Sequence, residues 1–171
     1  MIEADKITQE DLDKYISCSL NMLYERDHYL IYHKRDDKTN ENGSHVPERS
    51  IVFRFGLYFD SIFRESITSF YHIDVEYSRD INDVKTLPQA DNLVENKNRC
   101  PDLIVHRRGN NNHNLLVIEF KPWWNQNQQA DREKVKLFVT PSIQYKYKYG
   151  AVVLFGKQRE ECKIEFIRNE G

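Results

Sequence analysis

The sequence lacks any long apolar run. Hydrophobic residues make up 39% of the 171 residues and charged residues 30%, and no stretch approaches the roughly 18 apolar residues of a membrane-spanning helix. The opening residues, Met1 to Lys6, are acidic and lack both the basic start and the apolar stretch of a secretion signal. These absences predict a cytoplasmic chain without membrane association.

Paired cysteines and net positive charge are also absent. The three cysteines, Cys18, Cys100 and Cys162, are far apart and include no Cys-x-x-Cys pair, which argues against a disulfide framework and against a zinc site. The formal net charge of −2 lacks the basic excess that phosphate-binding proteins usually have. A nucleic-acid partner therefore requires local basic clusters or a metal ion that supplies positive charge.

The chain length fits one domain, residues 1–171, with residues 1–35 as an N-terminal helical extension. Thr8, followed by Asp11, predicts a helix start, and apolar periodicity or alternation marks the other elements. The predicted helices are Gln9–Arg26, a helix that starts near Pro47 and contains the apolar stripe from Ile51 to Ile62, and Gln128–Phe138. The predicted strands are Tyr71–Tyr77, Leu103–His106, Leu115–Phe120, Tyr145–Phe155 and Lys163–Ile167. Residues 79–99 form a long polar stretch of the kind that is usually functional or mobile.

Two β-rich segments around the turn Gly109–Asn114 predict a hairpin with charged residues at one end. If Asn111 lies near its centre, Asp102 faces the stretch from Glu119 to Lys121. Because side chains alternate along a strand, Glu119 and Lys121 share a face, and cross-strand neighbours have Cβ atoms roughly 5 Å apart. The hairpin therefore predicts that the three side chains converge. The alternative is a Glu-Lys pair at the solvent-facing end of a strand.

Two adjacent carboxylates repel each other, and a hard divalent cation relieves that repulsion. Asp102 and Glu119 are therefore the predicted ligands of Mg²⁺, with the backbone carbonyl of Phe120 as a third ligand. Such an ion polarises a phosphoryl oxygen and makes a coordinated water more acidic. Lys121 is the predicted catalytic lysine, which orients or deprotonates that water or stabilises charge on the phosphate.

The array Pro101-Asp102 followed by Glu119-Phe120-Lys121 resembles the PD-(D/E)xK nuclease superfamily, whose members have the restriction-endonuclease-like fold. The predicted order of helices and strands from Glu48 to Phe155 agrees with that fold. More narrowly, the segments PERS, EYSR, PDLIVHRRG and NLLVIE, which begin at residues 47, 76, 101 and 114, are similar to uncharacterised bacterial members of the superfamily.

The resemblance implies an α/β domain with a mixed central sheet of four or more strands flanked by helices. It also implies a Mg²⁺-dependent nuclease, with Mn²⁺ as a substitute, that acts on nucleic acid, with DNA as the expected polymer. Glu48 occupies the position of an auxiliary acid on the helix before the first core strand; alternatively, it only favours the positive helix N-terminus. Members that cut both strands of a duplex often act as dimers, so a homodimer is one of the states that the resemblance allows.

Basic residues around the long polar stretch and the hairpin, and one on the following helix, are the predicted contacts to nucleic acid: Arg79, Arg99, Arg107, Arg108 and Lys134. Lys134 also fits a surface ion pair with Asp131. Trp123 and Trp124 either stack on nucleobases or pack under the following helix. The alternation of tyrosine and lysine from residue 145 to 149 fits nucleic-acid contact or a half-buried strand. A non-catalytic nucleic-acid or protein binding module on the same fold is the alternative to a nuclease.

Overall fold

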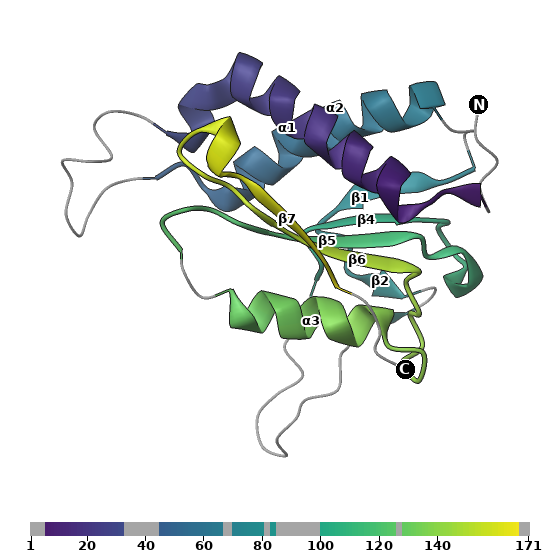
Figure 1. Cartoon of the computed structure of the whole chain (residues 1–171). Helices are drawn as coiled ribbons and strands as arrows, with labels where there is room; N and C mark the ends of the chain where they lie inside the picture. The colour runs from purple at the N-terminus through teal and green to yellow at the C-terminus, as the bar shows by residue number, and fades with distance from the viewer. Residues whose placement is uncertain are drawn as a thin grey trace.

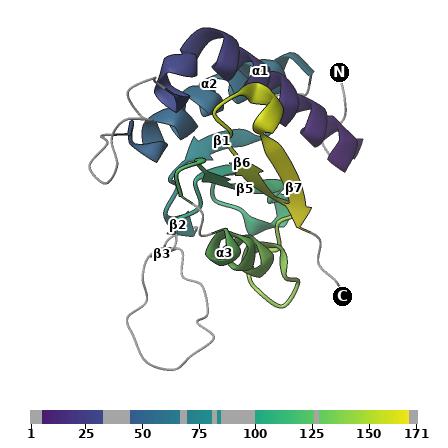
Figure 2. The same cartoon turned by 60° about the vertical axis from the view of Figure 1, so that its left-hand side comes forward.

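The computed structural model describes residues 6–32, 45–66, 70–80, 83–84, 100–125 and 128–167. Within them the chain is an α/β domain with a mixed sheet covered by helices on both faces, which confirms the predicted fold class at that level. In Figure 1, α1 and α2 lie above the sheet and α3 lies below it, and Figure 2 shows the same three layers from another side. No helix in the described part combines the length and the apolar character that crossing a membrane requires.

The first layer is a pair of helices, α1 (Gln9–Ile31) and α2 (Glu48–Ser66). Thr8 caps α1 as predicted: its hydroxyl accepts a hydrogen bond from the Asp11 N–H at 3.1 Å, and its own N–H donates to the Asp11 carboxylate at 2.9 Å. The helix kinks at Asp27 (φ −128°) and continues for one more turn, so the predicted end at Arg26 is too early.

These two helices share one core with the upper face of the sheet. The apolar stripe predicted for α2 is buried, and Phe55 and Phe59 are fully enclosed. Leu12 and Leu20 of α1 belong to the same cluster of buried residues, so the predicted N-terminal helical segment is part of the main core. Asp27 adds a polar link between the helices, because its carboxylate accepts hydrogen bonds from Arg54 and Tyr58 on α2.

The sheet described here has five strands in the order β1-β4-β5-β6-β7. They are β1 (His72–Val75), β4 (Leu103–His106), β5 (Leu116–Lys121), β6 (Tyr149–Leu154) and β7 (Lys163–Ile167). Neighbouring strands are antiparallel except β5 and β6, which are parallel and are connected through α3 (Gln129–Val139). A separate pair, β2 (Arg79–Asp80) and β3 (Asp83–Val84), begins the segment predicted to be a long loop; residues 81–82 and 85–99 lie outside the described part.

α3 packs tightly on the lower face of the sheet. At Gly150 of β6, an added Cβ would lie 2.4 Å from Cγ1 of Val135, so the close approach of helix and strand requires glycine there. The strand begins at Tyr149, later than predicted, because residues 145–148 form a turn that tucks Tyr145 and Tyr147 against Phe138 of α3. Tyr145 and Tyr147 are therefore core residues of a turn, and their rings are not exposed to a nucleobase, whereas Tyr149 is half-buried at the start of β6.

Candidate functional site

The predicted hairpin brings its three charged residues to one end of the sheet, on the face that α3 covers. Leu103 of β4 pairs with Ile118 of β5, so the register continued by one residue sets Asp102 opposite Glu119, within the predicted range. Glu119 and Lys121 alternate with Phe120 and share a face. The Phe120 N–H donates a hydrogen bond to Oδ2 of Asp102 at 2.8 Å, which fixes that carboxylate beside the strand.

Glu119 is the most deeply buried of these charges. Its side chain is 3% exposed, and its two oxygens lie 2.8 and 2.9 Å from Nζ of Lys134, one turn inside α3. Only the Oε2 contact has hydrogen-bond geometry, so Oε1 is a buried acceptor without a hydrogen bond among the described residues. Lys134 also donates to the backbone carbonyl of Cys100 at 2.6 Å. The lysine therefore joins α3 to both strands of the hairpin.

Lys121 has its own partner on α3. Its Nζ lies 2.7 Å from Oδ2 of Asp131, and both side chains are largely buried, at 11% and 14% exposed. Burial lowers the pKa of Lys121, but the contact with Asp131 outweighs it, and the net pKa is raised. Asp131 and Lys134 thus form two ion pairs with β5 instead of the surface pair with each other that the sequence also allowed.

Glu48, the first residue of α2, belongs to the same electrostatic group. Burial, followed by repulsion from Asp102, raises the pKa of Glu48 to about 7, although Lys121 and Lys134 act in the opposite direction. The residue is half-buried, and its interaction with Asp102 and the two lysines agrees with the position of an auxiliary acid predicted for it. The other prediction for Glu48, a charge that only favours the helix N-terminus, does not account for this proximity.

The carboxylates of the site repel one another inside the protein. Burial raises the pKa of Asp102, against the hydrogen bond from Phe120, and burial with the nearby Asp102 raises the pKa of Glu119 well above its ordinary value. Together with Glu48 and Asp131, four carboxyl groups face two lysines, which leaves a formal charge of −2 when all are ionised. One divalent cation would neutralise this net negative charge.

The donors also suit such a cation in kind, since Mg²⁺ prefers carboxylate and carbonyl oxygens. The buried Oε1 of Glu119 is one such oxygen, and the Lys134 ammonium lies 2.8 Å from it. As the side chains stand, however, no three His, Cys, Asp or Glu side chains within the described ranges are grouped so that they could hold a metal ion. Charge and ligand type therefore fit Mg²⁺, while the ammonium of Lys134 holds Glu119.

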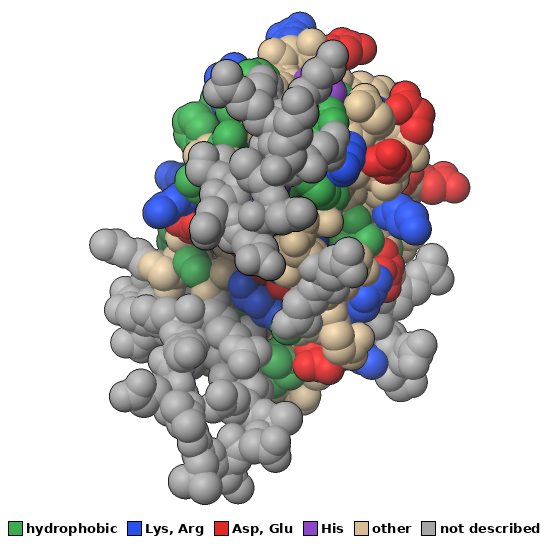
Figure 3. Space-filling model, turned by 90° about the vertical axis from the view of Figure 1, so that its left-hand side faces the viewer, with side chains coloured by type: hydrophobic (Ala, Val, Ile, Leu, Met, Phe, Trp, Pro, Cys, Tyr) green, Lys and Arg blue, Asp and Glu red, His purple; other side chains and the backbone are tan. Residues whose placement is uncertain are grey.

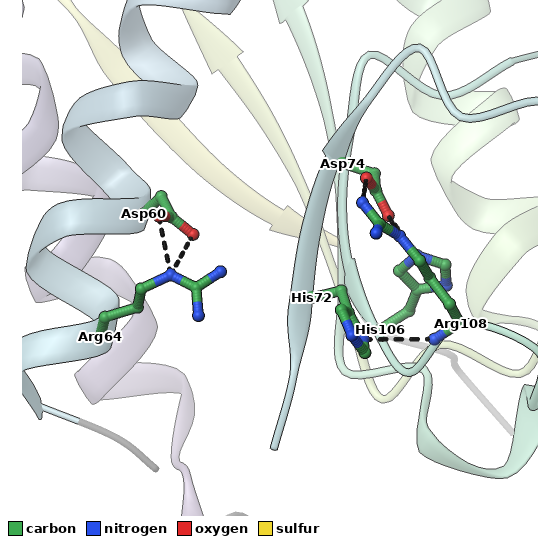
Figure 4. Close-up of polar contacts among 6 residues, drawn as sticks. All are labelled: Asp60, Arg64, His72, Asp74, His106 and Arg108. Carbon is green, nitrogen blue, oxygen red and sulfur yellow. Dashed lines mark hydrogen bonds and ion pairs between the residues drawn. The ribbon is translucent and has the colours of Figure 1, made fainter. Parts of the chain in front are cut away.

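The predicted nucleic-acid contacts are spread over several environments. Arg107 is exposed and its guanidinium lies 4.7 Å from the centre of the Phe70 ring. Arg108 pairs with Asp74 of β1, which also accepts from His106, as Figure 4 shows. Lys134 faces Glu119. The side chain of Arg79 and the whole of Arg99 lie outside the described residues.

The end of the molecule where β5 ends and α2 and α3 begin faces the viewer in Figure 3. Both signs of charge appear on the coloured part of this face, so local basic character is mixed with acidic side chains. The described residues thus form no uniformly basic surface in this view, in keeping with the net charge of −2.

The two tryptophans after the site pack instead against the end of α1 and against His45, which precedes α2. The indole N–H of Trp123 donates to the carbonyl of Ile31 at 3.1 Å, and the ring of Trp124 stacks on His45 with centroids 4.3 Å apart. Both are partly buried against the upper core. Packing was one of the two predicted roles, but the predicted partner was the following helix, and the observed partners lie on the opposite side of the sheet.

No family model, curated protein or solved structure matches this chain.

The sequence pattern singled out Asp131 and Lys134 but not their partners. The signal was available in the order of charges: Glu119-x-Lys121 on the strand and Asp131-x-x-Lys134 on the helix place opposite charges against each other when the helix crosses back antiparallel to β5.

Proposed function

We propose that the protein is a Mg²⁺-dependent nuclease that hydrolyses phosphodiester bonds of nucleic acid, with DNA as the expected polymer. The observation that carries this proposal is the buried Glu119 opposite Asp102, with Lys121 on the same face. Burying two neighbouring carboxylates is costly, and folds retain such groups mainly where a cation or a reaction uses them.

The strand arrangement supports the resemblance to PD-(D/E)xK nucleases. A helix, α2, is followed by β1, β4 and β5 in antiparallel order, and then by α3 and the parallel strand β6. This is the element order on which the resemblance was based, with the Asp at the start of the second of these core strands and Glu-x-Lys on the third. α1 and β7 extend this unit at its two ends.

In the proposed site, Asp102, Glu119 and the backbone carbonyl of Phe120 hold the cation. A bound Mg²⁺ or Mn²⁺ supplies positive charge to a phosphoryl oxygen and acidifies a water molecule. For Glu119 to serve as a ligand, its carboxylate must release the ammonium of Lys134. That ammonium then stands beside the site, where it can pair with a substrate phosphate, the role predicted for Lys134 from the sequence.

Lys121 and Glu48 have complementary roles in the proposal. The contact with Asp131 keeps the Lys121 ammonium charged, so it stabilises negative charge on the phosphate and orients the attacking water. Glu48 reaches the site from α2, and a carboxyl group whose pKa is about 7 can accept or donate a proton near neutral pH. Glu48 therefore acts in the proposal as the auxiliary acid that exchanges a proton with the reacting groups.

One observation favours the second candidate, a binding module without turnover. Both lysines of the site are already ion-paired with acids, and within the described residues no ready-made three-donor metal cluster exists. In that case the ion pairs stay in place and no metal binds. The same surface then binds nucleic acid or a protein and cleaves neither.

The experiment that decides between them is a cleavage assay with purified protein, Mg²⁺ or Mn²⁺, and labelled single-stranded DNA, duplex DNA and RNA. We expect cleavage that EDTA abolishes, that Glu119→Gln and Lys121→Ala remove, and that Glu160→Gln leaves intact. Glu160 is an exposed acid of the short segment Arg159–Glu161, which contacts α1 in the upper layer. Absence of cleavage together with absence of metal binding by calorimetry contradicts the nuclease. Nucleic-acid binding that survives both site variants, with no cleavage by the parent, supports the binding module.

A further inference from the structure

A hollow of about 680 Å³ lies beside the candidate site, between the kink of α1 and the first turns of α2. Its lining includes Arg49, Ser50 and Phe53 of α2 and, at the end of β1, Val75 and Glu76. The volume falls within the range of about 300–1,000 Å³ that is typical of sites for small organic groups. The lining combines an aromatic ring with two guanidinium groups and two carboxylates, and Arg54 and Asp27 among them pair with each other.

Phe53 points away from the core that the rest of α2 builds. Its side chain is 55% exposed, whereas its neighbours Ile51, Val52 and Phe55 are buried. A single exposed apolar residue is ordinary on a protein surface. Phe53 differs because it lines a hollow, and because within the described part of the chain its ring has no aromatic or cation–π partner. One face of the ring is therefore open to a planar ligand.

Arg49 precedes Phe53 by four residues, so the two side chains lie on the same face of α2, one turn apart. Among the described residues Arg49 has no ion pair or hydrogen bond, in contrast to Arg54, which is bound to Asp27 in the same hollow. An exposed guanidinium next to an open aromatic ring offers a phosphate group and a base the two contacts that single-stranded nucleic acid requires.

The hollow adjoins the carboxylates through two direct connections. Arg49 and Ser50 immediately follow Glu48, whose pKa responds to Asp102. On the other side, the N–H of Glu76 donates to the backbone carbonyl of Asp102 at 3.0 Å. Glu76 has a left-handed backbone (φ 50°), a conformation that is unfavourable for a residue other than glycine and that persists where the surroundings require it. A polymer strand that enters the site therefore passes the hollow.

We propose that this hollow binds one unpaired nucleotide of a single-stranded nucleic acid, with its base stacked on Phe53 and its phosphate paired with Arg49. A base in a duplex is stacked on both faces and cannot meet the ring, so the substrate class is single strands or unpaired ends. The link of this hollow to cleavage rests on the proposed function, but the binding of a nucleotide in it is tested independently of cleavage.

The test measures binding without cleavage. The full chain in EDTA is titrated into fluorescein-labelled oligothymidylate and into a duplex of equal length, and anisotropy reports the affinity. We expect tighter binding of the single strand, about tenfold or more weakening by Phe53→Ala, and retention of affinity by Phe53→Trp. The matched control is Leu57→Ala, because Leu57 is 46% exposed on the same helix but does not line the hollow.

A second variant examines the pairing of Arg49 with phosphate. Arg49→Gln is expected to weaken binding of the single strand and to reduce the slope of log affinity against log salt by about 0.7, the amount that each neutralised phosphate of a single strand contributes to that slope. Equal affinity for single strand and duplex overturns the proposal, as does no binding at all or Phe53→Ala behaving like Leu57→Ala. Loss of unfolding stability in Phe53→Ala with unchanged binding also overturns it, because the ring is then covered by protein.

The two proposals fail separately. A preference for single strands that depends on Phe53, in a protein that never cuts, supports the nucleotide site and contradicts only the nuclease. Metal-dependent cleavage that is the same for single strands and duplexes, and the same in Phe53→Ala, supports the nuclease and overturns the nucleotide site.

Discussion

Removal of Lys134 tests whether this residue is the internal counter-ion of the buried Glu119. The variant is Lys134→Met, which keeps the aliphatic part of the side chain and deletes the ammonium. Because Glu119 is 3% exposed and Lys134 17%, the change leaves an uncompensated charge in the interior. Breaking a buried ion pair from one side typically costs about 3–5 kcal/mol in unfolding free energy. We expect a loss of that size at pH 8 in EDTA.

The sign of the pH dependence follows from the raised pKa of Glu119. The folded state binds the Glu119 proton more tightly than the unfolded state, so a carboxyl group without its counter-ion destabilises the fold more as the pH rises. At pH 5.5 a larger fraction of Glu119 is protonated and neutral, and the cost of Lys134→Met should fall. The Glu119→Gln change costs less, since Lys134 keeps the Cys100 carbonyl and some solvent contact.

Urea unfolding followed by tryptophan fluorescence measures these free energies for the parent, both single variants and the double variant. We expect the double variant to regain much of the loss, with a coupling energy of about 2–3 kcal/mol. Lys136→Met is the matched control, because Lys136 is an exposed residue of the same helix and its loss should change stability by less than about 0.5 kcal/mol. Equal unfolding free energies for Lys134→Met and Lys136→Met would refute the counter-ion role.

Three further changes test other parts of the structure. Because the pKa of Glu48 is raised to about 7, the metal-free protein should lose stability as the pH rises from 5 to 7, and Glu48→Gln should flatten that dependence in denaturation curves at pH 5, 6 and 7. Gly150→Ala should lower the unfolding free energy by about 1–3 kcal/mol, because the new Cβ would overlap Val135, and unchanged urea midpoints would contradict the packing. Although burial opposes it, hydrogen bonds from arginine and histidine hold the pKa of Asp74 well below its usual value, so its contribution is present above about pH 4 and lost in acid. The Asp74→Asn variant should not show this loss of stability in acid unfolding, and a midpoint pH equal to the parent's would argue against the ion pairs.

The elements that sequence reasoning located well are those whose signal is local. The capping pair at Thr8 is present as predicted, and the bounds of β4 and β7 match the predicted strands. The predicted hairpin register placed Asp102 opposite the stretch from Glu119 to Lys121, and the observed partner, Glu119, lies at one end of that range.

The errors arose where tertiary contacts decide. Helical periodicity gives no sign that α1 resumes after the kink at Asp27, and alternating tyrosine and lysine looks the same in a strand and in the turn before β6. An i,i+3 pair such as Asp131 and Lys134 satisfies the rule for a surface ion pair, so only the docking of α3 on β5 reveals their actual partners. The hollow around Phe53 likewise depends on how three elements meet.

Phe120 links the position of the Asp102 carboxylate to the aromatic packing of the upper core. Its N–H donates a hydrogen bond to the Asp102 carboxylate. Its ring packs in the upper core, where it contacts the rings of Phe55 of α2 and Phe155. A substitution that loosens those aromatic neighbours would let the backbone at Phe120 shift and carry the carboxylate with it. Substitutions in the core between the helices and the sheet would then change the geometry of the charged site on the other face, although every charged residue stays the same.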